Sequence, residues 1–183
     1  VGKQASELFK DAQKMLGIIL ERVEIKPKGR FGIFEANSIG DDIEIHEQSN
    51  CCCQSSAHLV NLLRQQHKKP AGQANFCLSD YIAPKSSGLT DYLGAFVVCS
   101  GSGLDELSSF YENNNDDYNS IMVKELADRF AEAFAEKLHQ DVRRNYWGYA
   151  KNEQLDNEEL IKECYTGIRP APGYPACPDH THK

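Results

Sequence analysis

The chain has 183 residues, of which 40% are hydrophobic and 26% charged, which is typical of one globular domain with an apolar core. Its formal net charge is −7 and no Lys/Arg stripe stands out, which argues against a nucleic-acid-binding role. No apolar run approaches the roughly 20 residues that span a bilayer, and no secretory signal opens the sequence. Seven cysteines, three of them adjacent at Cys51–Cys53, indicate free thiols in a reducing cytosol. We therefore expect a cytoplasmic protein with no membrane or nucleic-acid partner.

The first part of the chain predicts one helix and two short strands. Apolar residues recur at helical spacing over 3–22, and Lys26–Gly29, with its proline, ends this helix. Strands are expected at Phe31–Phe34 and Asp42–His46, with Gly40 as the turn residue between them.

The middle of the chain predicts a second helix and two extended segments. The helix is expected over 55–67, capped by Ser55 or Ser56, and its buried side carries three leucines, Leu59, Leu62 and Leu63. A loop at Lys68–Gln73 precedes an extended segment at Phe76–Ile82, and Pro84–Gly88 breaks the chain again. The apolar run Tyr92–Cys99 is interpreted as a buried strand.

The last part of the chain is mainly helical. A short helix is expected over 104–111 and a long one over 118–146, in which an apolar residue recurs every fourth position from Met122. A final helix is expected over 157–165, where Asp156 and Glu159 have the spacing of a capping box. The elements do not alternate as regular βαβ units, so we expect an α+β domain with a mainly antiparallel sheet.

Residues 167–181 form the most informative stretch. Four prolines there exclude a helix interior or a central strand, and Gly173 permits a backbone conformation that a side chain would block. The resulting stiff loop fixes Arg169 relative to Tyr174. An arginine and an aromatic ring held in this way suit a ligand with an anionic end and a flat or cationic part. A rigid surface connection is the alternative.

Arg169 and Tyr174 each have an ordinary structural interpretation as well. Arg169 can bind a carboxylate through two parallel hydrogen bonds, or it can form a surface ion pair, for example with Glu163. Tyr174 can face a ligand, or it can be a packed tyrosine whose hydroxyl is hydrogen-bonded.

Acidic residues line one side of the long predicted helix, at Glu125, Asp128, Glu132 and Glu136. A solvated face, eased by Arg129 through Glu125, is the usual explanation. The functional alternative is a surface that meets a partner or lies near a positively charged ligand such as a sulfonium.

Two further cysteine groups suggest metals only weakly. Cys177, His180 and His182 resemble half of a zinc site without a fourth ligand, and Cys51–Cys53 lack a partner motif. We expect no metal site and no self-contained catalytic residue, because no common catalytic motif is present.

The proline loop and six further blocks resemble the activation (reactivation) domain of cobalamin-dependent methionine synthase, over nearly the full length. The blocks are Gly32-Ile-Phe with Gly40-Asp-Asp-Ile43, Cys77–Pro84, Asp91–Phe96, Asp116-Asp-Tyr118 with Ile121–Lys124, Leu126–Glu136 with Leu138-His139, and Tyr146-Trp147. The resemblance implies a curved, C-shaped α+β domain with a twisted antiparallel sheet and a long central helix. It also implies that the 183 residues are part of such a domain, truncated at both ends.

The resemblance further implies an activity in methionine biosynthesis, that of a methyltransferase module. The domain would bind S-adenosylmethionine and support reductive methylation of cob(II)alamin to methylcobalamin. Its partners would be the cobalamin-binding domain of the same polypeptide and a flavodoxin or similar reductase. Cobalamin and a zinc ion would be bound by other domains of the full enzyme, and this fragment is not expected to be active by itself.

Carried onto this sequence, the resemblance implies ligand contacts from Arg169, from the backbone around Ala171 and Gly173, and from Tyr174 and Glu163. Asp128 and Glu132 would face the cobalamin-binding domain. The alternative is a docking domain for the cobalamin domain or flavodoxin that binds no ligand of its own.

Overall fold

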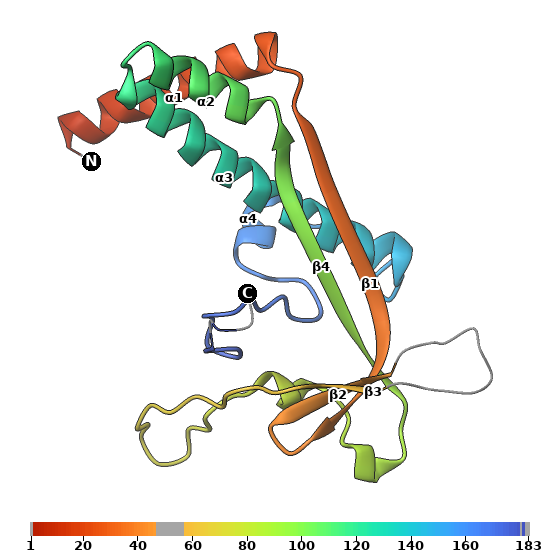
Figure 1. Cartoon of the computed structure of the whole chain (residues 1–183). Helices are drawn as coiled ribbons and strands as arrows, with labels where there is room; N and C mark the ends of the chain where they lie inside the picture. The colour runs from red at the N-terminus through yellow and green to blue at the C-terminus, as the bar shows by residue number, and fades with distance from the viewer. Residues whose placement is uncertain (1, 47–56, 180, 182–183) are drawn as a thin grey trace. The chain divides into compact units, whose positions relative to one another are not determined.

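The structure is a computed structural model that describes residues 2–46, 57–179 and 181. Its strands are β1 (Lys26–Ile39), β2 (Asp42–His46), β3 (Ala57–Val60) and β4 (Asp91–Ser102), and its helices are α1 (Lys3–Arg22), α2 (Leu104–Asn113), α3 (Asp117–Asp141) and α4 (Asn157–Ile161). The strands form one sheet in the order β3-β2-β1-β4, with neighbouring strands drawn in opposite directions (Figure 1). The predicted α+β class with an antiparallel sheet is confirmed.

The chain divides into two compact units, and each is described here by itself. Unit 1 comprises residues 1–30 and 96–152, and unit 2 comprises residues 31–95 and 153–183. Within the described residues, no helix is both long enough and apolar enough to cross a bilayer.

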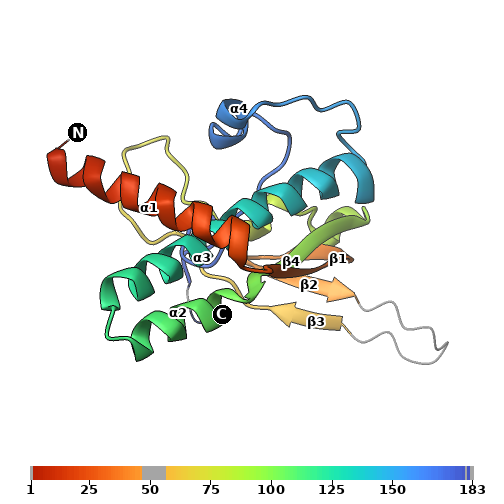
Figure 2. The ribbon, with the colours of Figure 1, turned by 90° about the horizontal axis from the view of Figure 1, so that it is seen from above.

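The core of unit 1 lies between its three helices. Met15 and Ile19 of α1 pack with Leu104, Met122 and Val123, and each of these side chains is nearly or fully buried. Seen from above, α1 crosses α3, while α2 lies beside the first turns of α3 (Figure 2). The helix predicted over 3–22 is confirmed to the residue.

The long helix predicted over 118–146 is confirmed as α3 followed by one wider π-helical turn. Asp116 caps its start, where the side chain accepts a hydrogen bond from the backbone N–H of Asn119 at 3.1 Å. The π turn covers Val142–Tyr146 and buries Arg143 completely. The Arg143 Nη1 atom lies 2.7 Å from Nδ1 of His139, one turn earlier.

The core of unit 2 forms where β1 and β2 meet the segment after residue 77. Ala36, Ile43 and Ile82 are its buried apolar residues. Strands β1 and β2 are antiparallel and reverse at the predicted turn residue Gly40, so Ala36 lies opposite Ile45. The strand predicted at 42–46 is confirmed, whereas the one predicted at 31–34 is the middle of a much longer strand.

The helix predicted over 55–67 is wrong in the described part of that range. Residues 57–60 form β3, which pairs with β2 so that Ile43 lies opposite Val60, and residues 61–67 have no regular structure. The predicted caps, Ser55 and Ser56, lie outside the described residues. The leucine spacing misled because Leu59 and Leu63 are 53% and 45% exposed, and of the three leucines only Leu62 packs against the core.

Two further predictions need correction. Residues 78–81 form a 3₁₀ turn within the segment expected to be extended. The strand predicted as buried is β4, but its side chains alternate between the two faces, and Val97 is 67% exposed. An apolar run indicated burial on both faces, whereas no residue of β4 is fully buried, and partly buried and exposed positions alternate from Phe96 to Ser100.

Arg64 holds the irregular segment that follows β3. Its guanidinium donates to Asp41 Oδ1 from Nη2 at 2.8 Å, to both oxygens of Asp80 at 2.7 Å, and to the carbonyl of Asn75 at 2.7 Å. Hydrogen bonds and charge from Asp80 and Asp41 raise the pKa of Arg64, and the bond from Arg64 lowers that of Asp80. One planar donor group therefore fixes three separate parts of unit 2.

Candidate functional site

The chain enters the candidate site through α4, a helix of five residues. Asp156 accepts a hydrogen bond from the N–H of Glu159 at 2.9 Å, and the Glu159 side chain accepts one from the N–H of Asp156 at 2.9 Å. The predicted capping box is confirmed, although the helix ends earlier than the predicted residue 165. Because so short a helix is marginal in isolation, these reciprocal bonds are what define its start.

The end of α4 places Glu163 in an unusual backbone conformation. Glu163 has φ +55°, its N–H donates to the carbonyl of Leu160 at 3.0 Å, and the N–H of Cys164 donates to the carbonyl of Glu159 at 3.0 Å. This is the Schellman motif, whose left-handed position glycine normally occupies. Glu163 keeps an exposed side chain there at a local cost of about 1 kcal/mol, which suggests that its carboxylate has a use.

The proline loop is closed by three backbone hydrogen bonds. The N–H of Tyr174 donates to Ala171 O at 3.0 Å, that of Gly173 to Cys177 O at 2.7 Å, and that of Cys177 to Tyr174 O at 2.9 Å. Gly173 has φ +97°, a conformation that L side chains rarely adopt. The expected loop is therefore confirmed, as is its need for a glycine at position 173.

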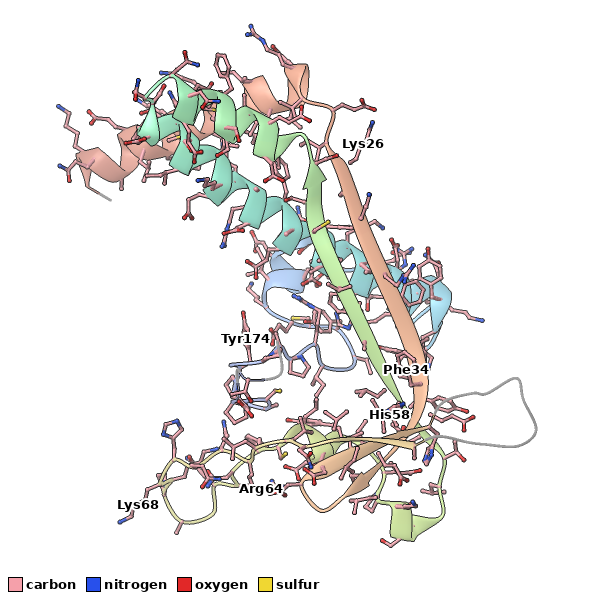
Figure 3. The ribbon with its side chains drawn as sticks, viewed as in Figure 1. Lys26, Phe34, His58, Arg64, Lys68 and Tyr174 are labelled. Atoms are coloured by element: carbon pink, nitrogen blue, oxygen red, sulfur yellow. The ribbon has the colours of Figure 1, made fainter. Side chains whose placement is uncertain are left out.

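The loop presents its candidate side chains in different ways. Tyr174, labelled in Figure 3, has a side chain that is 56% exposed. Ala171 and Gly173 are exposed as well, whereas Arg169 is half-buried. An open ring and exposed backbone can meet a flat group, while a partly buried guanidinium binds a carboxylate more strongly than one in bulk water does. Unit 2 thus carries all five predicted ligand residues within 163–174.

Cys177 closes the loop but is a poor candidate for chemistry of its own. Burial, helped by the charges of Cys77 and Asp179, raises the pKa of its thiol. The thiol therefore stays protonated at neutral pH, whereas nucleophiles and metal ligands are thiolates. His180 and His182, which form the weak zinc-like pattern with Cys177 in the sequence, lie outside the described residues, as do Cys51–Cys53.

The two residues predicted to face a partner lie in α3, in unit 1. Asp128 and Glu132 are both exposed, in agreement with a solvated acidic face. The predicted relief of charge repulsion differs in detail, because the guanidinium of Arg129 forms its ion pair with Glu132, at 3.3 Å.

Sequence reasoning missed two features of this site. The left-handed conformation of Glu163 left no signal in the sequence, because only a glycine at that position would have predicted it. The closing role of Cys177 depends on its backbone atoms, which the residue type does not reveal.

Comparisons with known proteins agree with this geometry. The model of the family described as "Vitamin B12 dependent methionine synthase, activation domain" matches residues 1–183. A solved structure, described as the crystal structure of the MetH reactivation domain bound to AdoHcy, is 55% identical, with a TM-score of 0.82. That match covers 100% of this chain but only 55% of the other, so the present chain spans about half of its relative.

Proposed function

The chain belongs to the activation domains of vitamin B12-dependent methionine synthases, and from this we propose that it binds S-adenosylmethionine for reductive methylation of cobalamin. The observation that carries the proposal is the closed proline loop, which fixes Arg169, Tyr174 and the backbone between them. The AdoHcy bound to the 55% identical relative is the demethylated form of the same ligand, and this supports the assignment.

Each site residue suits one part of this ligand. The guanidinium of Arg169 matches the ligand's carboxylate, and the exposed carboxylate of Glu163 can accept hydrogen bonds from its ammonium or hydroxyl groups. The open backbone at Ala171 and Gly173 can lie close against the ligand. The face of Tyr174 offers a favourable environment to the sulfonium.

Methyl transfer from a sulfonium needs alignment more than acid–base help. The donor carbon, the sulfur and the accepting atom must lie in line, and a rigid loop supplies that order before the reaction. No residue of this chain is assigned a catalytic proton transfer. The site instead holds the donor and limits its motion.

The proposed partners follow from the same reaction. Cobalamin, held by another domain of the same polypeptide, supplies the cobalt that takes one electron and then the methyl group, converting cob(II)alamin to methylcobalamin and S-adenosylmethionine to S-adenosylhomocysteine. A flavodoxin or similar reductase supplies that electron. We assign Asp128 and Glu132 to the surface that meets the cobalamin domain. In the same proposal, a further domain of the polypeptide binds a zinc ion, and the reaction takes place in the cytoplasm.

Calorimetry with S-adenosylmethionine on the complete activation domain tests the proposal. Arg169→Ala should weaken binding by about 10- to 100-fold, because hydrogen bonds between charged groups contribute roughly 1.5–3 kcal/mol. Arg169→Lys should recover only part of the loss, since lysine cannot form two parallel bonds to a carboxylate.

Arg144→Ala is the matched control, because Arg144 is an exposed arginine of unit 1. It should leave the affinity unchanged. Equal affinity in the Arg169→Ala and Arg144→Ala proteins would remove Arg169 from the site, and no saturable binding by the unmodified domain would contradict the proposed function itself.

A further inference from the structure

One face of the paired strands β1 and β4 in unit 1 carries a row of basic side chains. A Cβ placed on Gly29 would lie 3.0 Å from the ring of Phe134 in α3 and 3.3 Å from Val98, so Gly29 and Val98 share the face that α3 covers. Because side chains alternate along a strand, Lys28 and Arg30 project from the opposite face.

Lys26 belongs to the same row, two positions before Lys28. All three basic residues are exposed, and Figure 3 shows Lys26 projecting away from the helices of unit 1. Val97, 67% exposed, and Cys99, also exposed, lie on this face from the neighbouring strand. We call these five residues the basic strand face.

The sequence did not reveal this arrangement. The sequence predicted that Lys26–Gly29 ends a helix, and at a helix end its basic side chains would point in different directions. No Lys/Arg stripe was expected. As residues of β1 the three cations stand at every second position and point the same way. The neighbouring carboxylate of Glu24 offsets these positive charges only slightly. It lies 3.3 Å from Lys26 Nζ, but its side chain is 82% exposed, so solvent screens the ion pair.

We propose that the basic strand face docks an electron-transfer protein with an acidic surface. The inference rests on the proposed function only for the reason such a partner is needed, and its location comes from the charge pattern. The three positive charges on this face attract an acidic patch of a partner protein. Because the chain has a net charge of −7, the rest of its surface repels the same patch. This combination orients the partner on approach.

The character of the face favours a transient protein partner. It offers one exposed apolar side chain, Val97, among the cations, which fits the small polar interfaces of redox encounters. A nucleic acid or an anionic membrane would carry its charge well beyond this strip. Such an extended polyanion would meet the acidic remainder of the chain.

Charge reversal on the complete activation domain tests the proposal, with a flavodoxin of net negative charge as the probe. The test variant is Lys26→Glu/Lys28→Glu/Arg30→Glu. Its matched control is Lys3→Glu/Lys10→Glu/Lys14→Glu on α1, which changes the net charge equally at three exposed lysines. The strand variant should lose about tenfold or more in affinity at low salt, and its salt dependence should flatten.

The control should lose clearly less than the strand variant. Equal losses in both variants would mean that only net charge matters and would overturn the assigned face, as would no loss in either. Tighter, strand-dependent binding of duplex DNA or phosphatidylserine vesicles than of flavodoxin would overturn the choice of a protein partner.

Protection of a cysteine from alkylation can be measured on the unmodified protein, so this second test does not depend on whether a variant folds. Bound flavodoxin should slow alkylation of Cys99 several-fold, read by peptide mass spectrometry, while the exposed Cys164 of unit 2 reacts as before. Protection of Cys164 with Cys99 unaffected would place the partner elsewhere. The strand variant should still bind S-adenosylmethionine normally, so failure of this inference is distinguishable from failure of the proposed function.

Discussion

Glu163 combines an exposed carboxylate with a backbone conformation that glycine adopts more easily. Glu163→Gly should therefore raise the free energy of unfolding by about 0.5–1 kcal/mol and at the same time weaken S-adenosylmethionine binding. Urea denaturation and calorimetry on the same samples measure the two effects. Most substitutions at ligand-binding residues are not expected to increase the stability of the fold while they decrease the affinity for the ligand.

Glu158→Gly provides the matched control within the same helix. Glu158 is exposed and lies inside α4, where glycine is unfavourable, so this change should lower stability by about 0.5–1 kcal/mol and leave binding unaffected. Destabilisation by both changes would show that the φ of +55° at Glu163 brings no strain.

The loop from Arg169 to Tyr174 was predictable because proline and glycine restrict the backbone in ways that residue type alone encodes. The conformation of Glu163 was not, since glutamate gives no sign of a positive φ. The half-burial of Arg169 also depends on packing from distant residues.

At the scale of elements, helices were predicted better than strands. The capping box at Asp156 and the apolar period of α3 are local signals, and both are confirmed. The prediction for β3 failed because its pairing with β2, whose partner residues lie 11 to 17 positions earlier, overrides a leucine spacing that suits a helix. The full length of β1 was hidden by Pro27, which was interpreted as a helix terminator.

Gly101 in β4 lies very close to the backbone of the neighbouring strand β1. A Cβ there would overlap the carbonyl oxygen of Lys26, and φ is +89°. Gly101→Ala should therefore cost about 2–4 kcal/mol of stability, from steric overlap together with an unfavourable backbone conformation. Thermal and urea unfolding of the complete domain measure this loss.

Gly17→Ala in α1 is the contrasting change, because a Cβ at Gly17 meets nothing within 4 Å and the position is inside a helix. It should stabilise by about 0.5–1 kcal/mol. A Gly101→Ala protein as stable as the parent would mean that β4 can move away from Lys26 freely.

At the scale of the whole molecule, titratable groups limit stability at both ends of the pH range. Hydrogen bonds from Arg64 and from Lys124 lower the pKa of Asp80 in unit 2 and of Glu112 in unit 1. Both groups stabilise the fold above their ordinary pKa values of 3.8 and 4.5, and that contribution disappears as pH falls through the lower folded-state values.

At alkaline pH the dependence of stability on pH has the opposite sign, so stability falls as pH rises. Burial raises the pKa of Cys177 above its ordinary 9.0, and partial desolvation together with the hydrogen bond to Asp11 raises the pKa of Tyr118 above 10.0. Their contributions hold below these values and are lost as pH rises through the folded-state values. Urea unfolding at a series of pH values should give a plateau between about pH 5 and 8 with a decline on each side. Asp80→Asn and Glu112→Gln should each lower the plateau and make the acid limb less steep; an unchanged acid limb in both would contradict the assignment.

Each unit is assembled from two stretches of chain that are far apart in sequence, residues 1–30 with 96–152 and residues 31–95 with 153–183. During synthesis, the ribosome releases the first stretch of each unit long before its complement exists. Unit 1 is not complete until translation has passed residue 152, nor unit 2 until it has passed residue 183, and no single cut in the polypeptide separates one intact unit from the other. The proline loop proposed to bind the ligand belongs to the last stretch, so it is among the final parts of these 183 residues to be synthesised and to reach its neighbours.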